Sequence, residues 1–210
     1  MEALEEKVRR RLESNMWYHG TVDKNWDSIC RKGILVDYNR ETSEALDFGY
    51  GFYLAPTAER AERYIQGMMQ NTSFYDESDV AMVLGFEFQP LKWFEEDTYN
   101  TKVFSKYDDE FARFVFENRT ENVAGSKQHR YDAIYGVMSD AVPALEVQNY
   151  KMGRKTKEEV IEALKKQTSM KQISLHNQGI CDTISLKEAY ILDKTSGGRK
   201  ELNVSDYCRQ

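Results

Sequence analysis

The sequence predicts a single main domain of the α+β class with a hydrophobic core, and three observations support this prediction. Short segments typical of strands are interleaved with segments of helical periodicity, but the two kinds do not alternate strictly as they do in βαβ proteins. Of the 210 residues 40% are hydrophobic, so the chain can bury a core without a metal or disulfide. The three prolines and the absence of a linker-like stretch before residue 193 favour one main domain, which we place at residues 16–192.

The first elements follow from periodicity and from turn residues. Residues 2–14 carry charges of alternating sign and a thin apolar stripe of Leu4, Val8 and Leu12, which predicts an amphipathic helix within a segment 1–15. A short aromatic strand follows at residues 17–21. Asp23 can cap the next helix, and Gly33 is placed to end it.

The middle of the chain contains the longest apolar runs. Residues 47–55 form a glycine-punctuated turn that enters a strand, and residues 57–70 have helical periodicity. Residues 80–88 are apolar throughout, as in a buried strand, which Pro90 ends. Residues 91–107 fit no single element, and a helix is expected from residue 108 to residue 118.

The last third alternates strands and helices. Strands are expected at residues 131–138, 172–176 and 186–192. Thr156 and Glu159 match a capping box, which predicts a helix from there to about residue 167. The glycine-, serine- and charge-rich residues 193–210 are expected to form a loosely held tail.

Charge and cysteine content restrict the function classes. Lysine and arginine total 29 against 35 acidic residues, a net charge of −6, which disfavours tight non-specific binding to nucleic acid. The dense basic candidate outside the termini comprises Lys151, Arg154, Lys155 and Lys157. No apolar run is long enough to cross a bilayer, and the N-terminus lacks the apolar core of a secretory signal. Three widely spaced cysteines predict a reducing, cytoplasmic environment with no disulfide framework, and no metal-binding motif occurs, so we expect no metal.

Two segments carry a chemically informative pattern. The first is Tyr18-His19-Gly20-Thr21, and the second is Gly49-Tyr50-Gly51-Phe52-Tyr53-Leu54-Ala55. Tyr53 lies 34 residues after His19, and Tyr64 lies 11 residues after Tyr53. In order and spacing, these segments resemble the diphtheria-toxin-like and poly(ADP-ribose) polymerase-like ADP-ribosyltransferases.

The resemblance extends over roughly residues 16–192. The segments FARFVFENR, YDAIYGVMSDA and KQISLH are similar to a bacterial branch described only as a domain of unknown function. The resemblance implies a split, mostly antiparallel sheet flanked by helices. It also implies NAD⁺ as co-substrate.

The resemblance assigns the NAD⁺-binding residues. His19 would hydrogen-bond the adenine-side ribose, Gly20 would pair its backbone with the nicotinamide carboxamide, and Thr21 would offer its hydroxyl to the ribose. The rings of Tyr53 and Tyr64 would stack on the nicotinamide, because a flat cationic ring between two aromatic faces gains from stacking and cation–π attraction. Each tyrosine alone is also typical of a half-buried core residue. In the polymerase branch of the family, a serine that binds the carboxamide often stands where this chain has Ala61.

A third motif of the family, a glutamate that opens a later strand, corresponds here to Gln172. An amide keeps an acceptor oxygen but loses the negative charge that stabilises a developing ribose cation. Strand alternation puts Gln172, Ser174 and His176 on one face, so His176 is either a general base or a hydrogen-bonded strand-end histidine. Glu188 is a second candidate for the glutamate role.

The sequence leaves two possible roles open for other polar residues. Arg119 could bind the NAD⁺ diphosphate or form a structural ion pair. Asp140 could orient an acceptor or cap the next helix. His129 is expected in a solvated loop.

These residues predict a mono-ADP-ribosyltransferase that cleaves the nicotinamide–ribose bond of NAD⁺. The acceptor would be a protein or a nucleic acid, and the biological role would be toxin-like or anti-phage. An antitoxin or a regulatory protein is the expected protein partner, and no membrane partner is expected. Two alternatives remain: an NAD⁺ glycohydrolase, and a non-catalytic module that binds NAD⁺, ADP-ribose or a protein.

Overall fold

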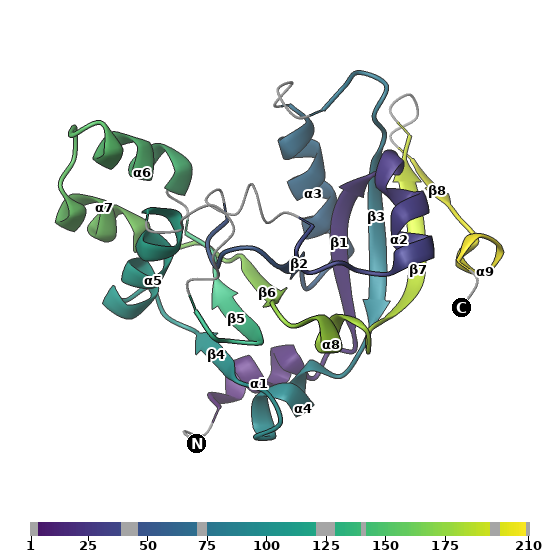
Figure 1. Cartoon of the computed structure of the whole chain (residues 1–210), viewed down its shortest axis with the longest axis horizontal. Coiled ribbons are helices and arrows are strands. Elements are labelled where there is room, and N and C mark those ends of the chain that lie inside the picture. The colour runs from purple at the N-terminus through teal and green to yellow at the C-terminus, as the bar shows by residue number, and fades with distance from the viewer. Residues whose placement is uncertain are drawn as a thin grey trace. The chain divides into compact units, whose positions relative to one another are not determined.

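The structure, a computed structural model, describes residues 4–38, 46–70, 75–120, 129–139, 142–193 and 198–208 (Figure 1). Its contacts divide the chain into two compact units. The first comprises residues 1–35, 53–95 and 179–210, and the second comprises residues 36–52 and 96–178. The expected boundaries after residues 15 and 192 differ from these, because the first helix and the C-terminal residues both belong to the first unit.

An antiparallel sheet forms the centre of the first unit. Its strand order is β1-β3-β7-β8, and the strands are β1 (Met16–Val22), β3 (Ala81–Glu87), β7 (Ser185–Leu192) and β8 (Arg199–Glu201). The helices of this unit are α1 (Glu6–Leu12), a 3₁₀ turn (Asp23–Asn25), α2 (Trp26–Lys32), α3 (Ala58–Met69), α4 (Pro90–Glu95) and α9 (Val204–Tyr207). The short α8 (Gln178–Cys181) begins at the last residue of the second unit.

Helix α3 covers one face of this sheet. Ala61 and Ile65 of α3 pack with Val22, Val83 and Tyr190 in one buried cluster. Their spacing of four residues places the two α3 side chains on one side of the helix, as the periodicity predicted. The cluster fixes α3 against β1, the strand that carries His19 and Gly20.

The second unit is built on a smaller sheet of order β2-β6-β5-β4. The unit boundary falls within β2 (Phe52–Leu54), because Phe52 belongs to the second unit and the next two residues belong to the first. The other strands of this sheet are β4 (Thr101–Phe104), β5 (Ala133–Val137) and β6 (Lys171–Leu175). β5 pairs antiparallel with β6 and parallel with β4. Helices α5 (Asp109–Thr120), α6 (Pro143–Lys151) and α7 (Lys157–Leu164) lie together in this unit (Figure 1).

The predicted α+β class and the mostly antiparallel pairing are confirmed. The apolar run at residues 80–88 is β3, and the three later strands are β5, β6 and β7. The unassigned residues 91–107 contain β4 and all of α4 except its first residue, and α6 was not predicted. Because Val147 is the one buried side chain of α6, that helix has no apolar stripe by which sequence could reveal it.

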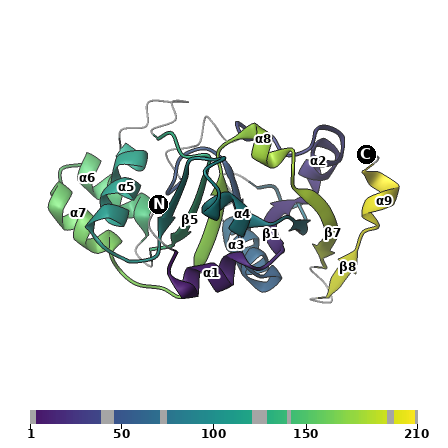
Figure 2. The same ribbon diagram turned by 90° about the horizontal axis from the view of Figure 1, so that it is seen from below.

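The C-terminal residues differ from the loose tail that we expected. β8 pairs with β7, and the two strands lie side by side in Figure 2. Asn203 caps α9 by accepting a hydrogen bond from the backbone N–H of Ser205. A disulfide joins Cys208 to Cys30 of α2, although the three widely spaced cysteines had predicted a reducing environment without a disulfide framework.

The capping box at α7 yields a first prediction. The Thr156 hydroxyl accepts from the Glu159 N–H at 3.2 Å, and the Glu159 carboxylate accepts from the Thr156 N–H at 2.7 Å. Thr156→Ala removes the first bond and is expected to lower the free energy of unfolding by about 1 kcal/mol. Urea unfolding followed by circular dichroism measures this change. Thr156→Ser, which keeps the hydroxyl, should unfold like the original protein, and equal losses in both variants would contradict the capping role.

Candidate functional site

Gly20 lies where β1 approaches α3 most closely. A Cβ added at Gly20 would stand 2.5 Å from the carbonyl oxygen of Ala61 and 3.0 Å from the Cβ of Ile65. No side chain fits there without moving β1 away from the helix. Ala61 itself is buried under this contact. The glycine of the His19-Gly20-Thr21 motif therefore has a structural reason in addition to any role with a ligand.

The backbone of Gly20 faces away from β3. The N–H of Tyr18 donates to the Ala55 carbonyl at 2.9 Å, and the Tyr18 carbonyl accepts from the Ala55 N–H at 2.7 Å. Polar backbone groups of alternate residues in a strand point to the same edge. The N–H and C=O of Gly20 consequently point to the Tyr18–Ala55 side of β1, which is the orientation that pairing with a carboxamide requires.

His19 is held by the strand that carries Tyr53. Its Nδ1 lies 2.8 Å from the backbone carbonyl oxygen of Tyr53. A carbonyl only accepts, so Nδ1 carries the proton, and in the neutral ring Nε2 is the acceptor nitrogen. Burial lowers the pKa of His19 from 6.5, and the bond to Tyr53 opposes this shift only in part. At neutral pH the ring is thus uncharged and has the tautomer that suits a hydroxyl donor.

The lowered pKa of His19 makes stability depend on pH. Unfolding restores a pKa near 6.5, so between the lowered pKa and 6.5 the unfolded chain binds more protons. The stability that neutral His19 provides is complete above pH 6.5 and is lost as the pH falls below it. His19→Gln should therefore lose less stability than the original protein between about pH 7.5 and pH 5 in urea unfolding. Parallel curves for the two proteins would contradict this prediction.

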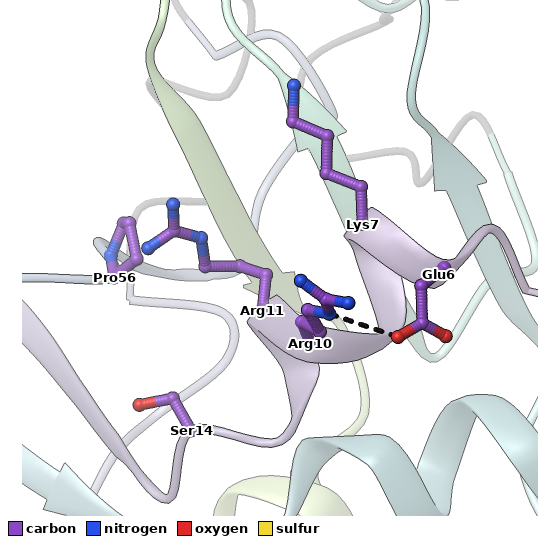
Figure 3. Close-up of a pocket in the computed structure, with 6 residues that line it drawn as sticks. All are labelled: Glu6, Lys7, Arg10, Arg11, Ser14 and Pro56. Atoms are coloured by element: carbon purple, nitrogen blue, oxygen red, sulfur yellow. Dashed lines mark hydrogen bonds and ion pairs between the residues drawn. The ribbon is translucent and has the colours of Figure 1, made fainter.

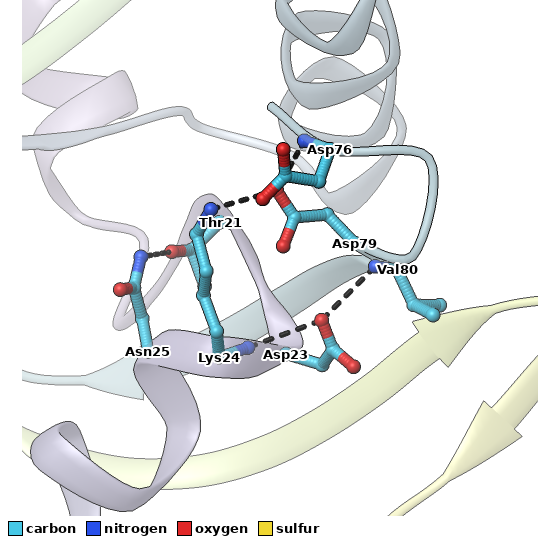
Figure 4. Close-up of polar contacts among 7 residues, drawn as sticks. All are labelled: Thr21, Asp23, Lys24, Asn25, Asp76, Asp79 and Val80. Carbon is cyan, nitrogen blue, oxygen red and sulfur yellow. Dashed lines mark hydrogen bonds and ion pairs between the residues drawn. The ribbon is translucent and has the colours of Figure 1, made fainter. Parts of the chain in front are cut away.

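Thr21 belongs to a polar network at the end of β1 (Figure 4). The hydroxyl of Thr21 is buried and accepts a hydrogen bond from Asn25 Nδ2 at 2.9 Å. Nearby, Asp23 accepts from the Val80 N–H, and Lys24 forms an ion pair with buried Asp79 at 2.7 Å. The Thr21 hydroxyl still has a proton to donate, but its position is fixed by Asn25.

The two predicted stacking tyrosines also lie in the first unit. Tyr53 is half-buried in β2, whereas Tyr64 on α3 is 48% exposed. Tyr64 stands one residue before buried Ile65 and thus on another side of the helix. His19, Gly20, Thr21, Tyr53 and Tyr64 therefore all lie in the first unit.

Glu188, the second candidate for the glutamate role, is also in the first unit. In the sheet register Gly85 faces both Tyr18 and Glu188. Burial raises the pKa of the Tyr18 hydroxyl, and the Glu188 carboxylate raises it further. Glu188 is exposed and close enough to Tyr18 to affect its ionisation.

Gln172 lies in the second unit, on β6. Its side chain is only 7% exposed, and its Nε2 has no hydrogen-bond partner among the described residues. A buried amide nitrogen without a partner costs roughly 1–3 kcal/mol, so its retention needs a reason such as a ligand or a buried water. Asn118 Oδ1 of α5, 1% exposed, is the other such atom in the described part of the chain.

His176 has the orientation that strand alternation predicted, but its contacts favour a positioning role. The Ser174 hydroxyl and His176 Nε2 are 2.8 Å apart, and His176 Nδ1 lies 2.7 Å from the Tyr50 carbonyl oxygen. Since that carbonyl accepts from Nδ1–H, Nε2 accepts from Ser174. Both ring nitrogens of His176 therefore form hydrogen bonds within the protein. Of the two interpretations that the sequence left open, the hydrogen-bonded structural histidine fits this geometry better than the general base.

His129 is buried, so the expectation of a solvated loop histidine was wrong. Its Nε2 donates to the Phe48 carbonyl at 2.8 Å, and its ring meets the His176 ring edge to face at 4.6 Å. The two histidines thus bind the carbonyls of the residues on either side of Gly49, which has a φ of 77°. Gly51 also requires glycine, because a Cβ there would stand 2.6 Å from His176 Nδ1.

Arg119 forms a structural ion pair. Its Nε and Nη2 donate to Asp47 Oδ1 at 2.9 and 2.8 Å, and both side chains are buried. Of the two readings that the sequence allowed, the ion pair is therefore the one observed. Asp140, the other residue with two readings, lies outside the described residues.

We also searched the described residues for a reactive thiol, a metal-binding cluster and a membrane-spanning helix. Burial raises the pKa of the free Cys181 thiol to about 12, which makes it a poor nucleophile at neutral pH. The described residues contain no group of three metal-ligating side chains. Within the described ranges, no helix is both long enough and apolar enough to cross a lipid bilayer.

Comparison with known protein families identifies the family of this chain. A family model described as "Protein of unknown function (DUF3990)" matches residues 34–186, well over half of the chain. A search of curated proteins and a search of solved structures each found no match. The match begins after His19 and Gly20, so the family alone says nothing about these two residues.

Proposed function

The chain belongs to the DUF3990 family of proteins of unknown function, and we propose that it is an NAD⁺-dependent mono-ADP-ribosyltransferase. The bond between the nicotinamide nitrogen and ribose C1 would break, with its electron pair leaving on neutral nicotinamide. A nucleophilic atom of a macromolecular acceptor would then bond to C1 and release its proton.

The contact between His19 and the Tyr53 carbonyl is the observation that carries this proposal. It joins two motifs that lie 34 residues apart and fixes His19 as a neutral ring whose Nε2 accepts. A ribose hydroxyl is a donor that fits this nitrogen. The outward-facing backbone of Gly20 and the half-exposed ring of Tyr64 provide matching groups for a carboxamide and a flat cationic ring.

Incubation with NAD⁺ labelled in its adenine tests the proposal. Label on a macromolecule of a cell lysate supports a transferase, free ADP-ribose supports a glycohydrolase, and unchanged NAD⁺ with a thermal shift supports a binding module. Tyr53→Ala should abolish labelling, because it removes the ring but keeps the carbonyl that His19 binds. Tyr38→Ala removes a tyrosine that is 70% exposed and serves as the control. Equal labelling by both variants would refute the site.

Gln172 requires a separate test, since its assignment comes from the family resemblance and it lies in the second unit. If it steadies a developing ribose cation, Gln172→Glu adds the missing charge and should raise turnover about tenfold, or about 1.4 kcal/mol in the barrier. Single-turnover rates of NAD⁺ cleavage measure this effect, with Gln172→Ala as the loss control. A fall in rate for Gln172→Glu in a folded protein would mean that the amide nitrogen has its own role.

The neutral Gln172 also supports the non-catalytic alternative. An unpartnered amide nitrogen is a donor that can bind a ligand without stabilising a cation. On that reading NAD⁺ or ADP-ribose binds, no nicotinamide is released, and Gln172→Ala weakens binding.

A further inference from the structure

Helix α1 presents two different faces. Val8 and Leu12 are buried, so this side of the helix packs on the first unit. Lys7, Arg10 and Arg11 follow the helical spacing on another side, and Ser14 continues that row just beyond the helix. The sequence pattern had indicated the apolar stripe, but not that the basic residues form a face of their own.

The basic face lines a cavity of about 480 Å³ in the first unit (Figure 3). Its walls are Glu6, Lys7, Arg10, Arg11, Ser14 and Pro56. In the figure the Arg11 side chain extends toward Pro56, which lies two residues after the end of β2, the strand of Tyr53. The volume lies within the range of small-molecule sites, and three of the six lining residues are cationic.

The charges of the cavity are not balanced internally. Glu6 is the single carboxylate of the lining, and it already pairs with Arg10 at 3.0 Å. Within the described ranges, no ion pair involves Lys7 or Arg11, whereas the neighbouring Arg9 pairs with Glu95. In a chain of net charge −6, this local excess of positive charge stands out.

From this lining we propose that the α1 cavity binds a phosphate group of a nucleotide ligand, either free or within a single strand. Guanidinium groups bind phosphate oxygens with paired N–H donors, and an ammonium adds a point charge. Pro56 is the one apolar lining residue, so recognition would rest on phosphate and not on the base. The lining of the cavity shares no residue with the proposed nicotinamide contacts, so the phosphate site is proposed as a separate one.

Direct binding measurements test this inference independently of NAD⁺ cleavage. Fluorescence anisotropy would follow a short labelled oligothymidylate, and competition would use pyrophosphate, ADP and polyglutamate. Lys7→Ala with Arg11→Ala should weaken phosphate binding roughly tenfold or more. For the oligonucleotide, the salt dependence of log K should become shallower by about 1.4, since two phosphate contacts are lost.

A control of equal charge change is available. Lys32→Ala with Arg130→Ala also removes one lysine and one arginine, both exposed and outside the cavity, and should bind like the original protein. Glu6→Gln frees Arg10 and should tighten binding.

The competition pattern identifies the phosphate source. Competition by ADP or pyrophosphate at comparable concentration indicates a free nucleotide, and binding of the oligonucleotide alone indicates a strand. Polyglutamate competing as well as these ligands, no binding at all, or equal losses in the two double variants would each overturn the inference. None of these outcomes depends on whether NAD⁺ is cleaved.

Discussion

Asp47→Ala is expected to lower the free energy of unfolding by about 3–5 kcal/mol, because it leaves the Arg119 guanidinium buried without its counter-ion. Two nitrogens of Arg119 donate to Asp47 Oδ1 at 2.8 and 2.9 Å, and the side chains are 8% and 10% exposed. Equilibrium urea unfolding followed by circular dichroism measures the loss.

The Arg10–Glu6 pair provides the control, since its side chains are 74% and 68% exposed. Glu6→Ala should cost less than about 1 kcal/mol. Replacing both members of the buried pair by apolar residues, Asp47→Leu with Arg119→Met, should recover much of the stability that Asp47→Ala loses. A loss from Asp47→Ala no larger than that from Glu6→Ala would show that the pair is not buried in solution.

Gly20→Ala is expected to cost about 3 kcal/mol and to abolish NAD⁺ cleavage, if the proposed function is correct. The new Cβ would stand 2.5 Å from the Ala61 carbonyl oxygen, a backbone atom that moves only with α3. β1 must then shift away from the helix and carry His19 with it. Thermal unfolding and the labelled-NAD⁺ assay measure the two effects.

Gly67→Ala on α3 is the matched control. A Cβ at Gly67 meets nothing within 4 Å, and alanine is the better helix former. This variant should gain about 0.5–1 kcal/mol and keep full activity. If Gly20→Ala unfolds at the same temperature as the original protein, the close approach of β1 to α3 does not exist in solution.

Local patterns predicted most of the elements correctly. The apolar run at residues 80–88, the capping box at Thr156 and the Gly33 terminus all depend on neighbouring residues, and each is confirmed. The α6 helix was missed because its one buried side chain leaves no periodic signal. The fold class followed from the order of these elements.

The candidate site was predictable only in part. The motif spacing grouped His19, Gly20 and Thr21 with Tyr53 and Tyr64, and these residues do share a unit. No pattern near His129 or His176 indicates that their rings bind the carbonyls of Phe48 and Tyr50, because those partners are 81 and 126 residues away in the chain.

The sequence by itself determined which residues carry polar and aromatic groups and which local elements hold them. Only the tertiary structure decided which of these groups meet: Asp47 with Arg119 across 72 residues, and Cys30 with Cys208 across 178. The physical reason is that propensity, capping and periodicity act over one or two turns of chain. Burial and charge pairing instead depend on neighbours that folding alone brings together, and these decide whether a histidine is solvated, a tail is held or a basic helix face lines a cavity.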